Sequence, residues 1–367
     1  MQNDLLYQIA LSLTPNIGPV QAKILIEQLG SAETVFKTKA TQLKSIEGIG
    51  EIRANSIKNF SKFNEAEDEI KFIEKYNIVP LFITDKNYPQ RLLNCYDSPE
   101  LLYYKGNADL NTSKIVSIVG TRNHTDYGKQ LTEKLIKELT EQHVLIVSGL
   151  AYGIDAIAHK AALKNNLQTV GVLAHGLDQI YPTHHSSLAK DMIKEGGLLT
   201  EFRSRTNPDK HNFPTRNRIV AGMSDATIVI ETGIKGGSMI TAELANSYNK
   251  DVFAFPGKIT DSKSAGCNFL IKSNKAILLT DAEELVEIMG WEEKSHKSTA
   301  KKQKELFIEL SQEEKIVINI LKEKDGVHID ELNHKSGLSS SAVAAAMLNL
   351  ELQNVILSLP GKIYQLA

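Results

Sequence analysis

Cysteine and tryptophan are nearly absent from this chain of 367 residues, which contains two cysteines and one tryptophan. Cys95 and Cys267 belong to no CxxC or Cys/His pattern, so we expect neither a disulfide framework nor a structural zinc site. No run of about 18 apolar residues, the length that spans a bilayer, occurs. The N-terminal segment MQNDLLYQIALSL spaces its apolar residues as a helix does, unlike a signal peptide. These absences favour a soluble cytoplasmic protein with no membrane partner.

Neither sign of charge is in large excess, because the chain has 42 Lys and Arg residues and 44 Asp and Glu residues, which gives a net charge of −2. A histone-like polycation is therefore excluded, and attraction to nucleic acid must come from local clusters of charge. Hydrophobic residues make up 42% and charged residues 23% of the chain, as in ordinary globular proteins. The length predicts two or three domains.

Residues 1–75 have a helical pattern, and two segments, 16–25 and 47–57, resemble helix-hairpin-helix motifs. Glycines between two helices allow a tight turn and leave amide groups at the second helix, where a phosphate can bind. Glu51 lies near the mouth of the second hairpin. Phosphate binding and a purely structural pair of helical turns therefore both stay open.

Residues 76–290 alternate short apolar runs with helical stretches. Each run lacks polar alternation, as strands buried on both faces of a parallel sheet do. This pattern predicts a doubly wound α/β domain whose ligand binds beyond the C-terminal ends of the strands. The predicted strands are 114–119, 144–148, 169–174, 197–202, 226–231 and 252–256.

Residues 291–305 are polar and lysine-rich and are expected to form a linker. Residues 306–367 then predict a winged helix-turn-helix. Ser311 caps a first helix, a second runs over 329–338, and a third over 339–354, before two strands around Pro360 and Gly361.

The first strand-to-helix junction, Gly120, Thr121 and Arg122, is not the GxGxxG dinucleotide motif. Arg122 stands where that motif offers bare backbone to a phosphate, and a guanidinium can grip a phosphate in a bidentate manner. The alternative is a structural ion pair. The second junction, Ser148 and Gly149, is another small-residue turn that can hold an anion.

Asp155 and His159 follow the second junction at a helical spacing of four residues. This spacing allows acid/base pairing. A helix cap and a polar packing contact explain the two side chains as well.

The most polar stretch is the basic loop 203–218, with five Lys or Arg residues and one acid. Proteins that bind single-stranded nucleic acid typically combine cations along the phosphates with an aromatic ring on which a base stacks. In this loop, Phe213 offers such a ring. The alternative is that Phe213 belongs to the core and the charges are solvated. Asn217 and one of its flanking arginines can instead face inward.

A third glycine turn, Gly236, Gly237 and Ser238, precedes another helix and again favours anions. It is similar to the GGxGTxxE motif of nucleotide phosphoribohydrolases, although Met239 replaces a glycine. Glu243 is the one motif carboxylate placed for catalysis, and a role in the first helical turn explains it equally well. A nucleotide-binding phosphoribohydrolase-like enzyme is thus the alternative function. The histidines 175, 184 and 185 have no metal-binding spacing.

Six segments resemble the DprA (Smf) DNA-processing protein family in this order: VGTR, SGLAYGIDAIAH, GVLAHGLDQIYP, GGLLTEF, HNFPTRNRIVAGMSD and ETGIKGGSMITAELA. The resemblance covers residues 80–290. It implies a Rossmann-like, mostly parallel sheet, flanked by the sterile-alpha-motif-like (SAM-like) helical N-terminal domain and the winged-helix C-terminal domain that many members have.

The same resemblance implies a protein that is not an enzyme and needs no cofactor. It would bind and protect incoming single-stranded DNA in natural transformation, load the RecA recombinase onto it, and act as a homodimer. The family's phosphate-gripping arginine falls on Arg122, its serine-glycine turn on Ser148 and Gly149, and its lysine and stacking aromatic on Lys210 and Phe213. With the RNR element and the glycine turns, the residues predicted to bind single-stranded DNA are Gly120, Thr121, Arg122, Ser148, Gly149, Lys210, Phe213, Arg216, Arg218, Gly236, Gly237 and Ser238.

The recognition helix of the winged-helix domain, residues 339–354, contains Glu351 and no Lys or Arg. It therefore lacks the cations that neutralise phosphates and read base edges. We expect this domain to serve protein contact or regulation, which also weakens the alternative of a transcription regulator.

Overall fold

The computed structural model describes residues 2–292, 310–322, 324, 326–353, 355–359 and 362–366. The chain divides into two compact units, an N-terminal unit of residues 1–292 and a C-terminal unit of residues 293–367. Most of the predicted linker lies outside the described residues. Among those described, no helix is both long and apolar enough to cross a membrane.

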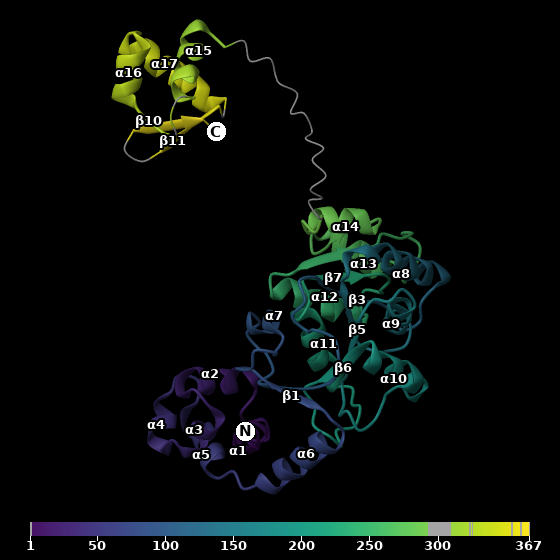
Figure 1. Ribbon diagram of the computed structural model, residues 1–367. Coiled ribbons are helices and arrows are strands. Elements are labelled where there is room, and N and C mark those ends of the chain that lie inside the picture. Colours follow the sequence, from purple (N-terminus) through teal and green to yellow (C-terminus); the bar gives the residue numbers. More distant parts are fainter. Residues whose placement is uncertain are drawn as a thin grey trace. The chain divides into compact units, whose positions relative to one another are not determined.

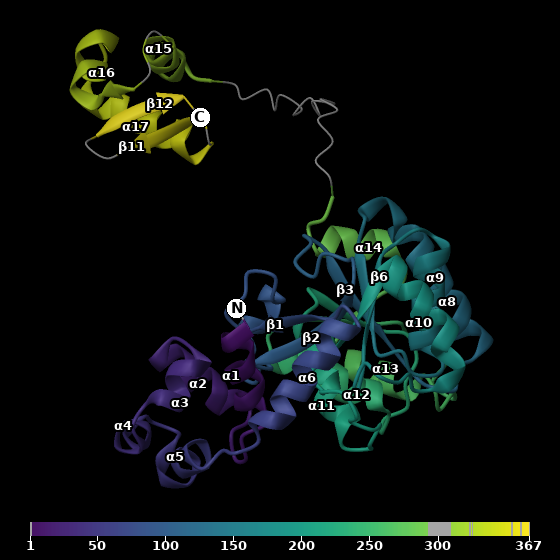
Figure 2. The same cartoon turned by 60° about the horizontal axis from the view of Figure 1, so that its bottom comes forward.

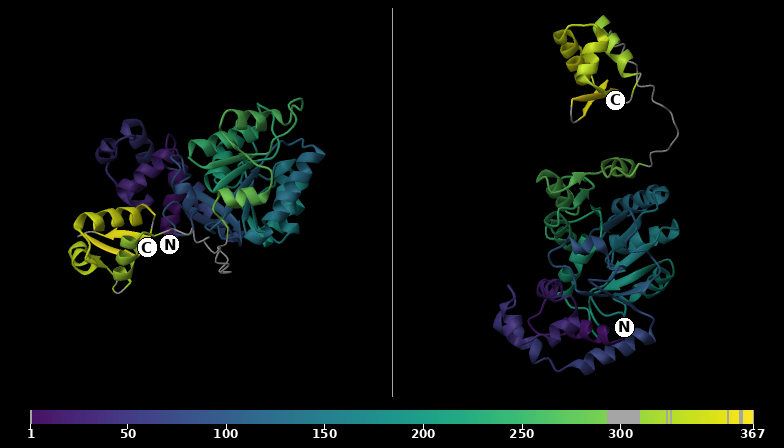
Figure 3. Two further views of the ribbon diagram at one scale, coloured as in Figure 1. Left: turned by 90° about the horizontal axis from the view of Figure 1, so that it is seen from above. Right: turned by 60° about the vertical axis from the view of Figure 1, so that its left-hand side comes forward.

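The N-terminal unit begins with six helices at one end of the unit (Figure 1 and Figure 3), and the two predicted hairpin loops lie between helices at residues 13–18 and 46–49. The two hairpin loops are tied to each other, because Arg53 donates through Nε to the carbonyl of Asn16 at 3.2 Å and through Nη1 to that of Gly48 at 2.9 Å. Glu51 pairs with Lys44 at 2.5 Å. The helices are α1 (Gln2–Ser12), α2 (Pro19–Leu29), α3 (Ala32–Lys37), α4 (Ala40–Ser45), α5 (Gly50–Lys58) and α6 (Phe63–Lys75).

These helices are not separated from the sheet, although the sequence suggested a boundary near residue 75. Ile9 and Leu25 of the helices belong to the same buried hydrophobic cluster as Phe82 and Leu102 of the sheet. Because the two parts share one core, residues 1–292 form a single unit.

A nine-stranded sheet crosses residues 2–292 in the order β1-β2-β6-β5-β4-β3-β7-β8-β9. The six predicted strands are present and parallel to one another, which confirms the doubly wound α/β fold. The pattern missed the antiparallel strands β1 and β2 at one edge and the short parallel strand β9 at the other. The strands are β1 (Val79–Phe82), β2 (Leu101–Gly106), β3 (Ile115–Val119), β4 (Leu145–Ser148), β5 (Thr169–Val172), β6 (Gly196–Thr200), β7 (Ala226–Val229), β8 (Asp251–Ala254) and β9 (Ile277–Leu278).

Helices cover both faces of this sheet. Alternate residues of β3 face opposite sides, so Val116 and Ile118 belong to one buried cluster and Ile115 and Val119 to another. Figure 2 shows α8, α9 and α10 along one side and α11 and α12 along the other. The helices of this part are α7 (Gln90–Leu93), α8 (Asp126–Glu138), α9 (Ile154–Lys164), α10 (Ser186–Lys194), α11 (Asn212–Gly222), α12 (Gly237–Ser247), α13 (Ala265–Lys272) and α14 (Ala282–Ile288), with 3-10 turns η1 (Leu139–Gln142) and η2 (Thr183–His185).

The strand order reverses next to β3. The chain moves outward from β3 through β4 and β5 to β6 and then returns to β7 on the other side of β3. In an open α/β sheet, such a switch point leaves a crevice beyond the C-terminal ends of the two strands. The loops that follow β3 and β7 therefore flank the place where a ligand binds.

The C-terminal unit is a winged helix, as predicted. Ser311 accepts from the amide of Glu314 at 3.2 Å, while the Glu314 carboxylate accepts from the amide of Ser311 at 2.8 Å, a reciprocal cap for the first helix. Gly337, in the left-handed conformation, ends the second helix. The elements are α15 (Gln312–Leu321), β10 (Val327–His328), α16 (Ile329–Ser336), α17 (Ser340–Leu352), β11 (Ile356–Leu359) and β12 (Ile363–Leu366).

Candidate nucleic-acid interface

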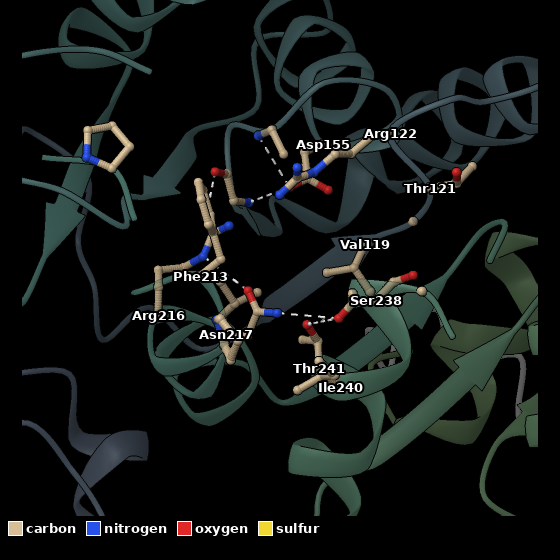
Figure 4. A pocket seen from close by; sticks show the side chains of 18 of the residues that line it. Val119, Thr121, Arg122, Asp155, Phe213, Arg216, Asn217, Ser238, Ile240 and Thr241 are labelled. Carbon is tan, nitrogen blue, oxygen red and sulfur yellow. Dashed lines mark hydrogen bonds between the residues drawn. The ribbon is translucent and has the colours of Figure 1, made fainter. Parts of the chain in front are cut away.

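A cleft of about 890 Å³ lies at the C-terminal ends of the parallel strands, at the switch point. Ten of the twelve predicted residues line it, and Ser148 and Arg218 do not. Figure 4 shows the cleft with Phe213, Arg216 and Asn217 of α11 on one side and Ser238, Ile240 and Thr241 of α12 nearby. The lining residues from the prediction are Gly120, Thr121, Arg122, Gly149, Lys210, Phe213, Arg216, Gly236, Gly237 and Ser238.

Arg122 is exposed at the rim of the cleft. No carboxylate within the described part of the chain forms an ion pair with it. Its guanidinium lies over the ring of Phe213, 5.1 Å from the ring centroid, which is a cation–π distance. The charge of Arg122 is thus available to a ligand, in contrast to the structural ion pair considered above.

Phe213 stands in the first turn of α11 and is half-buried, with its ring facing the cleft. The ring of Tyr181 lies 6.1 Å away, centroid to centroid, in a tilted arrangement. The hydrophobic cores of the unit do not include Phe213. An aromatic ring beside an unpaired arginine is a stacking platform for a base.

The second glycine turn already holds an anion of the protein itself. The carboxylate of Asp155 accepts from the amides of Gly149 at 3.2 Å and Ala151 at 3.4 Å. Burial raises the pKa of Asp155, while Arg216 and these hydrogen bonds oppose that rise. The sequence predicts that this turn offers its amides to a phosphate, but Asp155 occupies them.

Arg216 lies under the cleft and is 4% exposed. Its Nη1 donates to the carbonyl of Gly149 at 2.5 Å and to that of Val172, and its Nε donates to the Oδ1 of Asn217 at 3.1 Å. A side chain at residue 149 would collide with this guanidinium and displace it from its hydrogen bonds. Burial lowers the pKa of Arg216 to about 10, which leaves it charged at neutral pH. Arg216 therefore fixes the strand ends and adds positive potential to the cleft.

Arg218 and Ser148 point away from the cleft, contrary to their predicted role. Arg218 pairs with Glu201 and donates to the carbonyl of Asp97, and its side chain is 8% exposed. Ser148 is fully buried and donates to the carbonyl of Ile118 at 2.6 Å. Helical geometry explains the difference for Arg218, because residues two positions apart on α11 face different directions.

The third glycine turn opens α12 beside the first turn. The N-cap Gly236 has no side-chain cap, and the first turn of a helix leaves amide groups without helical acceptors. The hydroxyl of Ser238 donates to the Oγ1 of Thr232 at 2.7 Å, and Asn217 donates to the carbonyl of Gly237 at 3.3 Å. The positive end of α12 thus lines the same cleft as Arg122.

The acidic and basic side chains that a phosphoribohydrolase-like enzyme would need in the cleft form contacts with other residues instead. Glu243 does not line the cleft; it is exposed and pairs with Lys275 at 3.5 Å. His159 binds the hydroxyl of Thr169 at 2.6 Å rather than Asp155, and burial lowers its pKa to about 3. Within the described ranges, no group of three His, Cys, Asp or Glu side chains is placed to hold a metal ion.

The sequence reasoning missed the loop that follows β5. Gln179, Tyr181 and Thr183 of this loop also line the cleft. Gln179 and Tyr181 belong to the quoted motif GVLAHGLDQIYP, whose one Asp, Glu, Lys or Arg residue is the acidic Asp178. Clustering of positive charge therefore could not single out this loop. The aromatic Tyr181 next to Pro182 was the available signal.

An open parallel sheet with a positively charged, aromatic-lined cleft at its switch point defines a Rossmann-like domain that binds an extended anion. Comparison with known proteins makes this specific. The chain belongs to the DNA recombination-mediator protein A family, whose model matches residues 80–290. A second model, the DprA winged helix domain, matches residues 302–362. The chain thus has a role in DNA processing and recombination.

Relatives in several bacteria support this assignment. Protein Smf of Synechocystis sp. is 36% identical over 77% of this chain and 72% of its own length. DNA processing protein DprA of Streptococcus pneumoniae is 40% identical over 60% of this chain and 78% of its own length.

Two solved structures are similar as well. DprA of Streptococcus pneumoniae has a TM-score of 0.66 and 33% identity, and covers 77% of this chain and 97% of its own. DNA processing protein A of Helicobacter pylori, described for its single-stranded DNA binding mode, has a TM-score of 0.53 and 32% identity, and covers 58% of this chain and 96% of its own.

Proposed function

We propose that this protein binds single-stranded DNA along the cleft. Arg122 and Lys210 neutralise phosphates and a base stacks on Phe213, while the α12 turn receives a neighbouring phosphate. The observation that carries the proposal is the exposed guanidinium of Arg122, which lies over the ring of Phe213 and forms no ion pair with any residue that the structure describes. A duplex would hide its base faces from this platform, so single strands are favoured. The Helicobacter pylori relative, which binds single-stranded DNA, supports the same chemistry.

The finer biological role follows from family membership. We propose that the protein protects incoming single strands in natural transformation and loads RecA onto them. The two buried, unpaired cysteines suit the reducing cytoplasm, where we place this activity.

A homodimer is also part of the proposal. Strand β9 forms one edge of the sheet, and its Ile277 and Leu278 are each 40% exposed, close in sequence to the exposed Phe269 of α13. An apolar edge strand invites pairing with another chain, and a second copy related by a two-fold axis would cover it.

We further propose that the cleft acts by binding and not by catalysis. Among the described residues, Asp155 is the one carboxylate that lines the cleft, and it accepts hydrogen bonds from backbone amides. A phosphoribohydrolase needs a positioned acid near the glycosidic bond. Glu243, the candidate from the motif, lies outside the cleft.

Fluorescence-anisotropy titration tests the central proposal. A labelled oligothymidylate and a duplex of equal length are titrated with the wild type, Arg122→Ala and Phe213→Ala over a salt series. We expect single strand to bind more tightly, with a log–log salt slope of about −0.7 per neutralised phosphate and a weaker affinity in both variants. Tyr127→Ala is the control, because this exposed tyrosine lies outside the cleft.

Equal affinity for single strand and duplex, together with unchanged affinity in both cleft variants, would contradict the proposal. Release of free base from a nucleoside monophosphate by the wild type would favour the enzyme instead.

A further inference from the structure

The basic loop is fastened at its start by carboxylates of helix α6. Glu65 pairs with Arg203 at 2.6 Å. Glu69 accepts from the amide of Ser204 at 2.9 Å and from its hydroxyl at 2.5 Å. Two residues of the N-terminal helices, one helical turn apart, therefore hold two consecutive residues of the loop.

Glu69 makes this a strong attachment. It is 4% exposed, and a buried carboxylate is costly unless hydrogen bonds compensate for lost hydration. Because Ser204 supplies these hydrogen bonds through its amide and its hydroxyl, moving the loop would leave a buried carboxyl group without them. Hydrogen bonds from Arg203 and Lys62 lower the pKa of Glu65, so the Glu65 side chain stays ionised at neutral pH.

The loop is held from the other side by the segment after β5. Asp178 accepts from the amide of Arg205 at 3.0 Å, and Gln179 donates to the carbonyl of Thr206 at 3.1 Å. Arg205 has a φ of 63°, a left-handed conformation that costs free energy in a non-glycine residue and must be imposed by its surroundings. The loop therefore has one defined course from α6 to the cleft.

This course ends at the DNA-binding residues. Pro208 and Lys210 of the same loop line the cleft, and Phe213 follows at the start of α11. Only a few residues separate the attachment at Ser204 from Lys210. Helix α6 itself packs against α1, so the position of the loop depends on the N-terminal helices.

We propose that Glu65 and Glu69 are positioning residues through which the N-terminal helices set the affinity of the cleft for single-stranded DNA. The inference rests on the proposed function of the cleft.

The sign of the effect separates positioning from simple electrostatics. Removing two negative charges near a nucleic-acid site strengthens binding if only charge matters. Removing them weakens binding if they hold the loop, because a mobile loop must be ordered when DNA binds. The number of phosphates contacted does not change, so the salt slope stays the same.

The test compares two double variants of α6 in the full-length protein. Glu65→Ala with Glu69→Ala removes the attachment. Glu67→Ala with Asp68→Ala is the matched control, because these exposed side chains carry the same charge on the same helix, and Asp68 pairs with Lys71. Affinity for oligothymidylate is measured by anisotropy over a salt series, and trypsin cleavage at Arg203, Arg205 and Lys210 reports loop mobility.

We expect the attachment variant to bind about five- to tenfold more weakly with an unchanged salt slope, and trypsin to cut its loop faster. The control variant should bind as the wild type does or slightly more tightly, with unchanged cleavage. Unaltered or tighter binding by the attachment variant would overturn the inference. The proposed function would still be supported in that case, provided that the wild type binds and Arg122→Ala binds more weakly. The proposed function fails separately if the wild type does not bind.

Folding of each variant is checked by the fluorescence of Trp291, the single tryptophan, which packs on the core of the N-terminal unit. If the double variant unfolds, Ser204→Ala replaces it. This variant removes only the hydroxyl donor to Glu69, and we expect a two- to threefold weaker affinity, on the order of one hydrogen bond's contribution. Wild-type affinity in Ser204→Ala would then overturn the inference.

Discussion

Arg122, Arg216 and Arg218 share one side-chain chemistry but have three different environments. Arg122 is exposed and stacked on a ring, Arg216 is buried under the cleft and bound to carbonyls, and Arg218 is buried in an ion pair. Their contributions to DNA binding should differ accordingly. The exposed arginine meets the ligand directly, whereas the buried ones shape the site or the core.

Arg122→Lys separates charge from stacking. Lysine keeps the positive charge but lacks the flat guanidinium that lies on Phe213 and grips a phosphate with two donors. We expect about three- to tenfold weaker binding of oligothymidylate with an unchanged salt slope. In a Phe213→Ala background, Arg122→Lys should reduce the affinity for oligothymidylate by a smaller factor, which anisotropy titration can measure. Equal losses in both backgrounds would show that the stack contributes nothing.

Glu201→Gln tests the buried ion pair through its pH dependence. Burial raises the pKa of Glu201 to about 7, although Arg218 opposes this. A carboxyl whose pKa is higher in the folded state than in the unfolded state stabilises the fold at low pH, and that contribution is lost as pH rises through about 7. Between pH 5 and pH 8 the wild type should therefore lose stability relative to Glu201→Gln, by at most roughly 3 kcal/mol.

Denaturant unfolding followed by Trp291 fluorescence measures this difference. Parallel stability curves for the two proteins over that pH range would contradict the raised pKa.

At the scale of elements, the turns after β3 and β7 create the site because the strand order reverses between them. The first and third glycine turns, distant in sequence, meet across this switch point and both line the cleft. The second turn lies beside them, but Asp155 occupies its amides. Similar local sequences thus have different functions, depending on which side chain the fold brings to each turn.

The reciprocal cap of α15 predicts a local effect in the C-terminal unit. Ser311→Ala removes the acceptor of the Glu314 amide, which should cost about 1 kcal/mol. Amide hydrogen exchange in α15 should then be roughly fivefold faster. Ser340→Ala, at the exposed first position of α17, is the control and should leave the exchange of α15 unchanged.

At the scale of the molecule, a net charge of −2 coexists with a basic cleft. The positive groups are concentrated where the strand order reverses, and the N-terminal helices contribute carboxylates that hold the basic loop. The two parts of residues 1–292 share one core. This arrangement couples the N-terminal helices to the cleft, as proposed above.

The C-terminal unit should contribute little to single-strand affinity. Helix α17, the recognition helix of the winged helix, has no Lys or Arg over Ser340–Leu352, so it cannot neutralise phosphates. A chain ending at residue 299 should bind oligothymidylate within about threefold of the full-length affinity. A tenfold loss in the anisotropy titration would contradict this.

The sequence by itself determined the parallel sheet, the winged helix and most of the cleft residues. Solid apolar runs such as 114–119 are recognisable because strands buried on both faces have no polar alternation. Glycine turns after such runs indicate where ligands bind. Strands β1 and β2 escaped this reasoning, because they lie at an antiparallel edge and were not part of the repeating strand-helix pattern.

Only the tertiary structure decided which polar residues face the cleft. Arg216 and Arg218 are two positions apart in sequence, yet Arg216 lines the cleft and Arg218 pairs with Glu201 in the interior. The sequence could not show that Asp155 fills the second turn or that Glu69 reaches Ser204, which is 135 residues away. A side chain's role depends on partners that long-range packing supplies, whereas periodicity reports only which face of its own element it occupies.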